Sequence, residues 1–332
     1  MPLALDAALV DAIADADRAI RPTVLETPVV EWPQLGARVG ARVFVKREHL
    51  QRTGSFKLRG AINAARHAAR TGRRIVTASS GNHGIAVSHA LGALGLTGVI
   101  FLPETVAPAK LAAIHASGQE VRFFGSDSGD TEREAQRVAR GEGWHYLSPY
   151  NDRDVIAGQG TIGPELLRQL ERIDVVYVSV GGGGLVSGVA TALKAARPEI
   201  RIVGCSPVNS CVMHESVRAG RILDLPSRPT FSDGTAGGVD DGSITLGFCQ
   251  SLVDDWITVS EDEIASAVRD HIDEQHQLVE GAAGVAFAAL ALDAHRDRAR
   301  GMACHRVAIS CGANIGSARL RELLDVAAAP QR

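Results

Sequence analysis

Residues 174–205 of the chain read DVVYVSVGGGGLVSGVATALKAARPEIRIVGC. The stretch opens on a β-branched run at 174–180, passes through four glycines into an alanine-rich amphipathic segment, and ends on a second apolar run at 201–205. Two strand-like runs separated by a helical pattern predict a βαβ unit, whose helix carries the chain back so that the strands lie parallel. This stretch therefore predicts a parallel sheet covered by helices.

The same alternation continues along most of the chain. Apolar residues at helical spacing predict a first helix over 4–20, and Pro22 follows closely enough to end it. Further strands are predicted at 42–46, 74–79, 97–102, 120–124, 256–260 and 306–311. Strands that alternate with helices place the chain in the α/β class, with helices on both faces of the sheet.

The length and charge of the chain limit its organisation and its partners. At about 100 to 200 residues per domain, 332 residues form one large domain or two ordinary ones. Two glycine- and proline-rich segments, 143–165 and 206–248, interrupt the alternation and are candidate crossings between lobes. With 35 basic and 38 acidic residues, no basic excess directs the protein to nucleic acid or to an anionic membrane surface.

The cysteines and the apolar runs indicate the compartment. Five cysteines without a C-x-x-C pair predict neither a disulfide framework nor a zinc ribbon, so a reducing cytoplasm is expected. We find no signal-peptide pattern and no apolar run of about 18 residues, and we therefore expect no membrane span.

Lysine is scarce, and one lysine has an unusual position. The four lysines are Lys46, Lys57, Lys110 and Lys194. Lys57 follows a glycine turn in TGSFKLRG (53–60), at the start of a predicted helix, where the helix dipole disfavours a charged amine by a few tenths to about 1 kcal/mol. The neutral amine that this position favours can condense with an aldehyde, which predicts a Schiff-base lysine. The alternative is an ordinary surface lysine.

Two turns between a predicted strand and a predicted helix could bind anions. SSGNHG (79–84) offers hydroxyls and free N–H groups at a helix N-terminus, a ready site for a carboxylate or phosphate, although its residues could simply cap the helix. GGGGL (181–185) allows backbone amides to close around a phosphate. A dinucleotide fingerprint fails there, because Ser187 takes the third glycine position and no acidic residue follows the next strand. A purely structural turn remains the alternative.

A fourth motif, SCGAN (310–314), closes the last predicted strand. The thiol of Cys311 could make a weak hydrogen bond at the carboxyl edge of the sheet, although a lone cysteine that ends a strand is more often a small core residue.

Taken in order, SFKLRGA, SSGNHG, GGGGL and CGAN resemble the motifs of the fold-type II pyridoxal phosphate (PLP) enzymes, most closely the threonine and serine dehydratase group that also contains serine racemase. The resemblance covers nearly the whole chain. It implies the tryptophan synthase beta-like fold of two open twisted sheets with helices on both faces, and usually a homodimer. It also implies a large PLP-binding domain (1–72 and 151–332) and a small mobile domain (73–150).

The resemblance further implies a role for each motif residue. Lys57 would form the Schiff base with PLP and act as the proton-transfer base, and Ser80 would hold the substrate carboxylate on the opposite face. The other implied cofactor contacts are Phe56 beside the ring, Asn82 at the ring hydroxyl, Gly181, Gly182, Gly183, Gly184 and Leu185 at the phosphate, Glu280 near the ring and Cys311 at the pyridine nitrogen. Ser79, Asn82 and His83 are the further implied substrate contacts.

Three departures from the family pattern affect the expectations. Ser206 and Val212 stand where members that bind a structural divalent cation carry acidic residues, so we expect no metal site. The segment 232–247 is longer and richer in glycine than usual and resembles that of dehydratases for other substrates, including the hydroxyectoine-utilisation dehydratases. The regulatory domain of the biosynthetic threonine dehydratases is expected to be absent.

The leading hypothesis is a PLP-dependent dehydratase that removes water from a β-hydroxy amino acid such as threonine or serine, giving a 2-oxo acid and ammonia. The alternatives are a dehydratase for hydroxyectoine or a bulkier 3-hydroxy amino acid, an amino-acid racemase, and a non-catalytic PLP or amino-acid sensor. The reactive lysine argues against a sensor, which does not need one.

Overall fold

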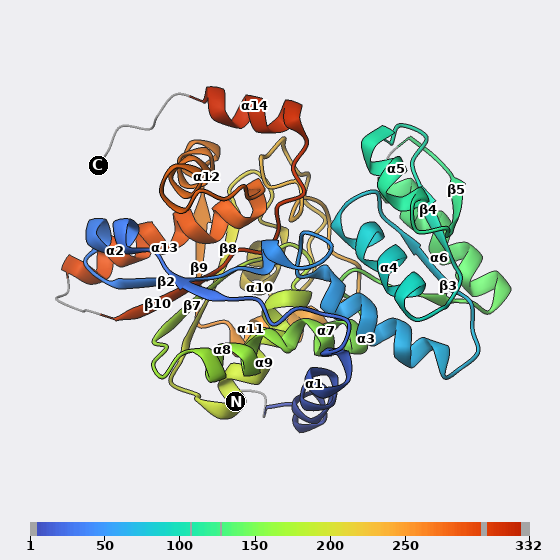
Figure 1. The fold of residues 1–332 in the computed structure, drawn as a ribbon, viewed down its shortest axis with the longest axis horizontal. Helices are drawn as coiled ribbons and strands as arrows, with labels where there is room; N and C mark the ends of the chain where they lie inside the picture. Colours follow the sequence, from blue (N-terminus) through green and yellow to red (C-terminus); the bar gives the residue numbers. More distant parts are fainter. Residues whose placement is uncertain (1–4, 107, 127, 300–303, 327–332) are drawn as a thin grey trace.

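A computed structural model describes residues 5–106, 108–126, 128–299 and 304–326 of the chain. The strands form two separate sheets (Figure 1). The order in the six-stranded sheet is β1 (Val29–Glu31), β2 (Arg42–Lys46), β10 (His305–Ile309), β7 (Val175–Ser179), β8 (Arg201–Pro207) and β9 (Asp255–Val259). The order in the four-stranded sheet is β5 (Glu120–Phe123), β4 (Gly98–Leu102), β3 (Ile75–Ala78) and β6 (His145–Tyr146).

Helices cover the sheets. Those that precede β7 are α1 (Ala7–Ile20), α2 (Pro33–Val39), the 3-10 turn η1 (Glu48–Leu50), α3 (Lys57–Ala69), α4 (Asn82–Ala93), α5 (Pro108–His115), α6 (Ser128–Glu142), α7 (Arg153–Gly160) and α8 (Ile162–Gln169). Those that follow it are α9 (Gly184–Ala196), α10 (Val212–Ala219), α11 (Thr245–Leu252), α12 (Glu261–Gln275), α13 (Gly281–Ala299) and α14 (Ser317–Asp325). Figure 1 shows α12 and α13 on one side of the six-stranded sheet and α8 and α9 on the other. The predicted α/β class with helices on both faces is confirmed.

Strand pairing matches the βαβ pattern of the sequence. β1 pairs antiparallel with β2, and every other pair of neighbouring strands in the two sheets is parallel. The eight predicted strands are all present, with ends that differ by at most two residues. The sequence reading missed β1 and β6, because strands of three and two residues are too short to show a period. The predicted helix over 4–20 is α1, and residue 4 lies outside the described part of the chain.

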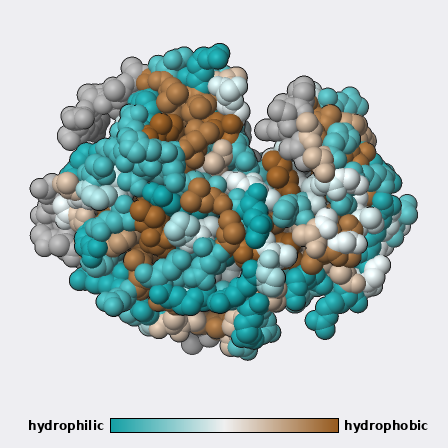
Figure 2. Space-filling view, viewed as in Figure 1, coloured by the Kyte–Doolittle hydropathy of each residue, from teal (hydrophilic) through white to brown (hydrophobic). Residues whose placement is uncertain are grey.

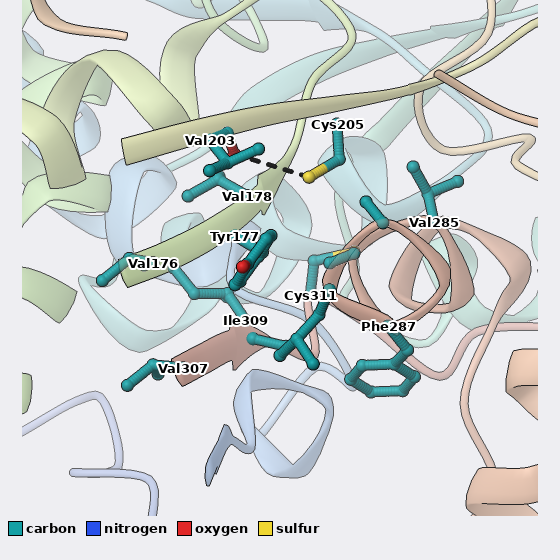
Figure 3. Packing of buried hydrophobic residues seen from close by; sticks show 14 of the residues in the cluster. Val176, Tyr177, Val178, Val203, Cys205, Val285, Phe287, Val307, Ile309 and Cys311 are labelled. Atoms are coloured by element: carbon teal, nitrogen blue, oxygen red, sulfur yellow. Dashed lines mark hydrogen bonds between the residues drawn. The ribbon is translucent and has the colours of Figure 1, made fainter. Parts of the chain in front are cut away.

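The centre of the six-stranded sheet is its most buried part. All five residues of β7 are buried, as are four of the five residues of β10. Runs that are apolar on both faces are typical of parallel strands covered by helices. The buried cluster in Figure 3 spans β7, β8, β10 and α13 and reaches Cys311, just beyond β10. The core therefore ends where the sequence motifs begin.

Three of the four motifs follow the carboxyl ends of parallel strands. SSGNHG connects β3 to α4, GGGGL connects β7 to α9, and CGAN follows β10. The fourth motif joins them through a bridge between Ser55 and Gly312, which holds the segment before Lys57 against the end of β10. Figure 2 shows a notch in the surface between the larger and smaller parts of the molecule. No helix in the described ranges has the length and apolar character needed to cross a membrane.

Candidate active site

A cavity lies at the carboxyl edge of the six-stranded sheet, where the motifs meet. Its empty volume, counted together with the open space at its mouth, is about 470 Å³. Its walls come from α3, α4, the glycine turn after β7, the loop before α11 and the segment after β10. The lining residues are Phe56, Lys57, Asn82, Tyr150, Ser179, Gly181, Gly182, Gly183, Gly184, Leu185, Gly234, Thr235, Glu280, Ala282 and Cys311.

Lys57 is the first residue of α3 and projects an amine into this cavity. Its Nζ donates a hydrogen bond to the Pro149 carbonyl at 3.0 Å and lies 5.2 Å from the centre of the Phe56 ring. Burial lowers the pKa of Lys57 to about 8, although the carboxylate of Glu280 opposes this shift. A much larger fraction of the amine is therefore neutral near pH 7 than in an exposed lysine, whose pKa is about 10.4.

The other lysines with described side chains are engaged elsewhere. Lys46 is fully buried, and its Nζ donates to Glu165 Oε2 at 2.5 Å and to the Thr27 carbonyl at 2.7 Å. Lys194 forms an ion pair with Asp254 at 2.7 Å. The side chain of Lys110 lies outside the described part of the structure. Lys57 is thus the described lysine that faces the cavity.

The glycine turn forms a cradle that side chains would fill. A Cβ at Gly182 would lie 2.3 Å from Cγ of Tyr150, and a Cβ at Gly181 would lie 2.9 Å from the Thr235 carbonyl oxygen. Gly183 has a φ of +86° and immediately precedes α9, which has no side-chain cap. The exposed N–H groups at this helix start can therefore bind an anion such as a phosphate.

Asn82 and Glu280 are bonded to each other at the wall of the cavity. Asn82 Nδ2 lies 2.9 and 3.1 Å from the two carboxylate oxygens of Glu280. The backbone N–H of Asn314 donates to Glu280 Oε2 at 3.1 Å, and Asn314 Nδ2 donates to Asn82 Oδ1 at 2.7 Å. Burial raises the pKa of Glu280, while the hydrogen bond from Asn82 counteracts this effect.

Cys311 closes the cavity on the side of the core. The residue is 3% exposed, and its carbonyl accepts a hydrogen bond from the N–H of Phe56 at 3.1 Å. Burial, followed by the nearby carboxylate of Glu280, raises the pKa of the thiol well above its ordinary value. Cys311 is therefore a neutral thiol at physiological pH.

The remaining predicted substrate contacts do not line the cavity. The hydroxyl of Ser79 accepts a hydrogen bond from the Gly81 N–H at 3.2 Å, and Ser80 is half-buried just before α4. His83 is buried, its Nε2 lies 3.0 Å from the Leu147 carbonyl, and burial lowers its pKa to about 3. Its ring is thus neutral, and it is buried in α4. The substrate roles of Ser79, Ser80 and His83 remain predictions.

Several residues of the cavity were not singled out from the sequence. Tyr150 covers Gly182 with its ring, and its hydroxyl accepts a hydrogen bond from the Asp240 N–H at 2.8 Å. Thr235 packs against Gly181, and the hydroxyl of Ser179 donates to the Ala282 carbonyl at 2.6 Å. Tyr150 and Thr235 lie in loops without a local motif, and Ser179 is the last residue of β7, close to the glycine turn. The sequence signal for Tyr150 and Thr235 was their location in the segments 143–165 and 206–248, which interrupt the alternation of strands and helices.

The set of groups around the cavity fits PLP. The amine of Lys57 suits the aldehyde, the glycine cradle suits the phosphate, and the amide of Asn82 suits the ring hydroxyl. The thiol of Cys311 is the polar group where the cavity meets the hydrophobic core.

Comparisons with known proteins agree with this assignment. The family described as "Pyridoxal-phosphate dependent enzyme" matches residues 20–310. The chain is 34% identical over 323 residues to "Threonine dehydratase 2 biosynthetic, chloroplastic" of Solanum lycopersicum; the match covers 96% of this chain but 53% of that protein. The chain thus spans about half the length of this relative.

Solved structures are similar over almost the whole chain. The processed form of threonine deaminase isoform 2 from Solanum lycopersicum has a TM-score of 0.90 and 32% identity, covering 98% of this chain and 95% of that one. Maize serine racemase has a TM-score of 0.88 and 32% identity, covering 94% and 95%. The chain therefore belongs to the pyridoxal-phosphate dependent enzyme family, within the fold-type II group of threonine dehydratases and serine racemases.

Proposed function

We propose that this protein is a PLP-dependent ammonia-lyase that removes water from a β-hydroxy amino acid such as threonine or serine, leaving a 2-oxo acid and ammonia. The observation that carries the proposal is the amine of Lys57, which faces the glycine cradle across one cavity and has a pKa near 8. The names of the tomato relatives, threonine dehydratase and threonine deaminase, support this reaction.

The residues of the cavity divide the binding of the cofactor between them. Lys57 would hold PLP as a Schiff base, with Phe56 beside the ring. Gly181 to Gly184 and Leu185 would bind the phosphate, Asn82 the ring hydroxyl, and Cys311 the ring nitrogen. When bound, PLP supplies an electron-withdrawing ring that stabilises negative charge at the α-carbon of the substrate.

Lys57 would also move the proton. Whenever it is not bound to the cofactor, the amine of Lys57, with its lowered pKa, would suit a general base near neutral pH. Its Nζ would take the proton from the α-carbon, and that proton, passed on to the β-hydroxyl, would let the hydroxyl leave as water. Water then hydrolyses the resulting enamine to the 2-oxo acid and ammonia. The Ser80 hydroxyl and the N–H groups near the start of α4 would hold the substrate carboxylate during these steps.

A panel of amino acids tests the proposal. Purified holo-protein is incubated with serine, threonine, a 3-aryl serine, hydroxyectoine and alanine, and ammonia and 2-oxo acid are measured together with the chirality of the remaining substrate. The compounds with a free α-amine and a β-hydroxyl, which are serine, threonine and the 3-aryl serine, should release equal amounts of ammonia and 2-oxo acid, and alanine should release neither. Racemisation of serine without ammonia release would instead establish the racemase alternative, which the similarity to maize serine racemase supports.

A second cavity favours a substrate bulkier than threonine as the alternative. It is a wide hollow that is open to solvent, and its walls include Tyr146, Asn151 and Asp240. It adjoins the first cavity at Tyr150, whose ring lines the first while its hydroxyl bonds Asp240 in the wall of the second. A substrate with a longer side chain could extend past Tyr150. A kcat/KM at least as high for hydroxyectoine or the 3-aryl serine as for threonine would support this alternative.

We further propose that residues 73–150 form a small mobile domain and that the protein is a cytoplasmic homodimer. All strands of the four-stranded sheet come from 75–146, which supports the first boundary. The five free cysteines are compatible with a reducing compartment. Light scattering on the purified holo-protein tests the dimer, and a monomer mass at micromolar concentration would contradict it.

A further inference from the structure

The side-chain amide of Asn82 is held by two neighbours that it meets only through the fold. Glu280 accepts from Asn82 Nδ2, and Asn314 Nδ2 donates to Asn82 Oδ1 at 2.7 Å. Asn314 Nδ2 also donates to the Thr53 carbonyl at 2.8 Å. Asn314 is not one of the residues that line the cavity, so its side chain acts there through Asn82, while its backbone N–H bonds Glu280.

The partners determine which way the amide of Asn82 points. The Thr53 carbonyl can only accept a hydrogen bond, so the Asn314 atom beside it must be the amide nitrogen. The second hydrogen on that nitrogen points at Asn82, whose nearer atom must then be the oxygen. The carboxylate of Glu280 likewise requires the nitrogen of Asn82 on its side. Two independent contacts thus assign the same orientation.

Backbone geometry leaves room for this arrangement. Gly54 has a φ of +72°, and a Cβ there would lie 2.5 Å from Asn314 Oδ1. A Cβ at Gly312 would lie 2.6 Å from Glu280 Oε1. The Ala313 N–H donates to the Gly54 carbonyl at 2.9 Å, beside the bridge between Ser55 and Gly312. Asn314 is therefore fixed to the same segment that leads into Lys57.

The orientation has a consequence for what Asn82 offers a ligand. Its oxygen accepts from Asn314, which does not line the cavity, and one N–H is used by Glu280. Its nitrogen faces the side of Gly234, whose Cβ would lie 3.9 Å away and which lines the cavity. One N–H donor therefore remains for a ligand oxygen, and a donor stabilises an oxyanion over a hydroxyl.

We propose that Asn314 is a positioning residue that, together with Glu280, directs an N–H of Asn82 into the cavity, so that the site binds PLP with an anionic ring oxygen. The proposal rests on the proposed role of Asn82, but not on the reaction or the substrate. Asn314 would stabilise the anionic form by preventing the amide of Asn82 from turning its oxygen toward that group.

The test is the absorption spectrum of the holo-protein as a function of pH, measured without substrate. The anionic ring oxygen gives a visible band and the neutral hydroxyl a near-ultraviolet band. Wild-type protein should show the visible band from about pH 6 to pH 9. In Asn314→Ala the near-ultraviolet band should grow at low pH, with its midpoint raised by about one pH unit or more, the size of one hydrogen bond to a charged group.

Two further variants make the result decisive. Asn82→Asp replaces the donor by an acceptor and should show the largest shift toward the near-ultraviolet band. Asn209→Ala is the matched control, because Asn209 Nδ2 also donates to a backbone carbonyl, that of Pro229 at 2.7 Å, but lies away from the cavity lining. It should keep the wild-type spectrum.

If Asn314→Ala does not fold, Asn314→Ser is used, since its short hydroxyl cannot span both partners. Wild-type spectra in either folded Asn314 variant at every pH would overturn the inference. A near-ultraviolet band dominating the wild-type protein would also overturn it. Wild-type protein that binds no PLP would contradict the proposed function instead.

Discussion

The lowered pKa of Lys57 is a property of one residue that can be measured directly. PLP should react with apo-protein at a rate that rises as the pH passes about 8 and then levels off, because only the neutral amine attacks an aldehyde. Borohydride reduction followed by peptide mapping should place the adduct on Lys57, and Lys57→Ala should give none. Lys194→Ala, which removes an ion pair with Asp254, is the control and should label normally. An adduct on Lys46, Lys110 or Lys194, or a midpoint above pH 10, would contradict the assignment.

The neutral thiol of Cys311 predicts a mild effect of substitution. A buried thiol with a raised pKa cannot keep the ring nitrogen protonated as a carboxylate would, so negative charge spreads less into the ring. Such a site should favour prompt loss of a β-leaving group. Cys311→Ser retains a weak polar partner of similar size and should keep activity within about tenfold of wild type. A loss of kcat as large as that of Lys57→Ala would show that Cys311 has another role.

The glycine turn and the ring of Tyr150 that packs over it form one structural unit, so the shape of the turn depends on this contact. Gly182→Ala would place a Cβ 2.3 Å from the ring of Tyr150, so either the ring or the turn must move. Overpacking of this size costs about 1 to 3 kcal/mol, and the Kd for PLP should therefore rise about tenfold or more. Gly247→Ala in α11, where a Cβ has no neighbour within 4 Å, should leave the Kd unchanged. The Kd for PLP is measured by fluorescence titration. Equal values for both variants would contradict the role of the glycine turn in binding the phosphate.

A buried ion network joins β2, α3 and α8 beneath the candidate site. The carboxylate of Glu165 accepts from Lys46 Nζ at 2.5 Å and from Arg59 Nη1 at 2.7 Å, and Arg59 also pairs with Glu48. Removing one partner leaves buried charge uncompensated, so Glu165→Gln should lower the free energy of unfolding by about 3 kcal/mol in denaturant titrations.

A surface pair gives the comparison for that network. Asp15 and Arg18 are both exposed, and Asp15→Asn should change the free energy of unfolding by less than about 1 kcal/mol. If the two variants destabilise the protein equally, the buried network does not contribute as argued.

Over the whole molecule, turnover should not depend on a divalent metal ion. Ser206 is buried and its hydroxyl donates to the Val180 carbonyl at 3.2 Å, while Val212 starts α10, so neither offers a carboxylate to a hard cation. Across the described ranges, no three His, Cys, Asp or Glu side chains gather in a way that could hold a metal. The rate of ammonia release should be the same before and after EDTA treatment. Loss of the rate with EDTA and recovery with Mg²⁺ or Ca²⁺ would contradict this prediction.

The sequence by itself determined the elements and the chemistry of the motifs. Strand and helix patterns repeat over 2.0 and 3.6 residues, so α1 and the eight longer strands were readable. The short strands β1 and β6 were not, and neither were α7 and α10, which lie in the two segments that were interpreted as interruptions. Lys57, Asn82 and the glycine turn were identifiable because their chemistry resides in residue types at a strand or helix end. All three lie at the cavity.

The tertiary structure alone decided which distant residues meet. β10 lies between β2 and β7, so the segment that follows β10 is placed beside the one that leads into Lys57, and no local period encodes this order. Tyr150, Thr235 and Asn314 reach the site through loops whose conformation depends on long-range contacts. The lowered pKa of His83 and the raised pKa of Glu280 likewise follow from burial, which is a property of the packed molecule rather than of the residue.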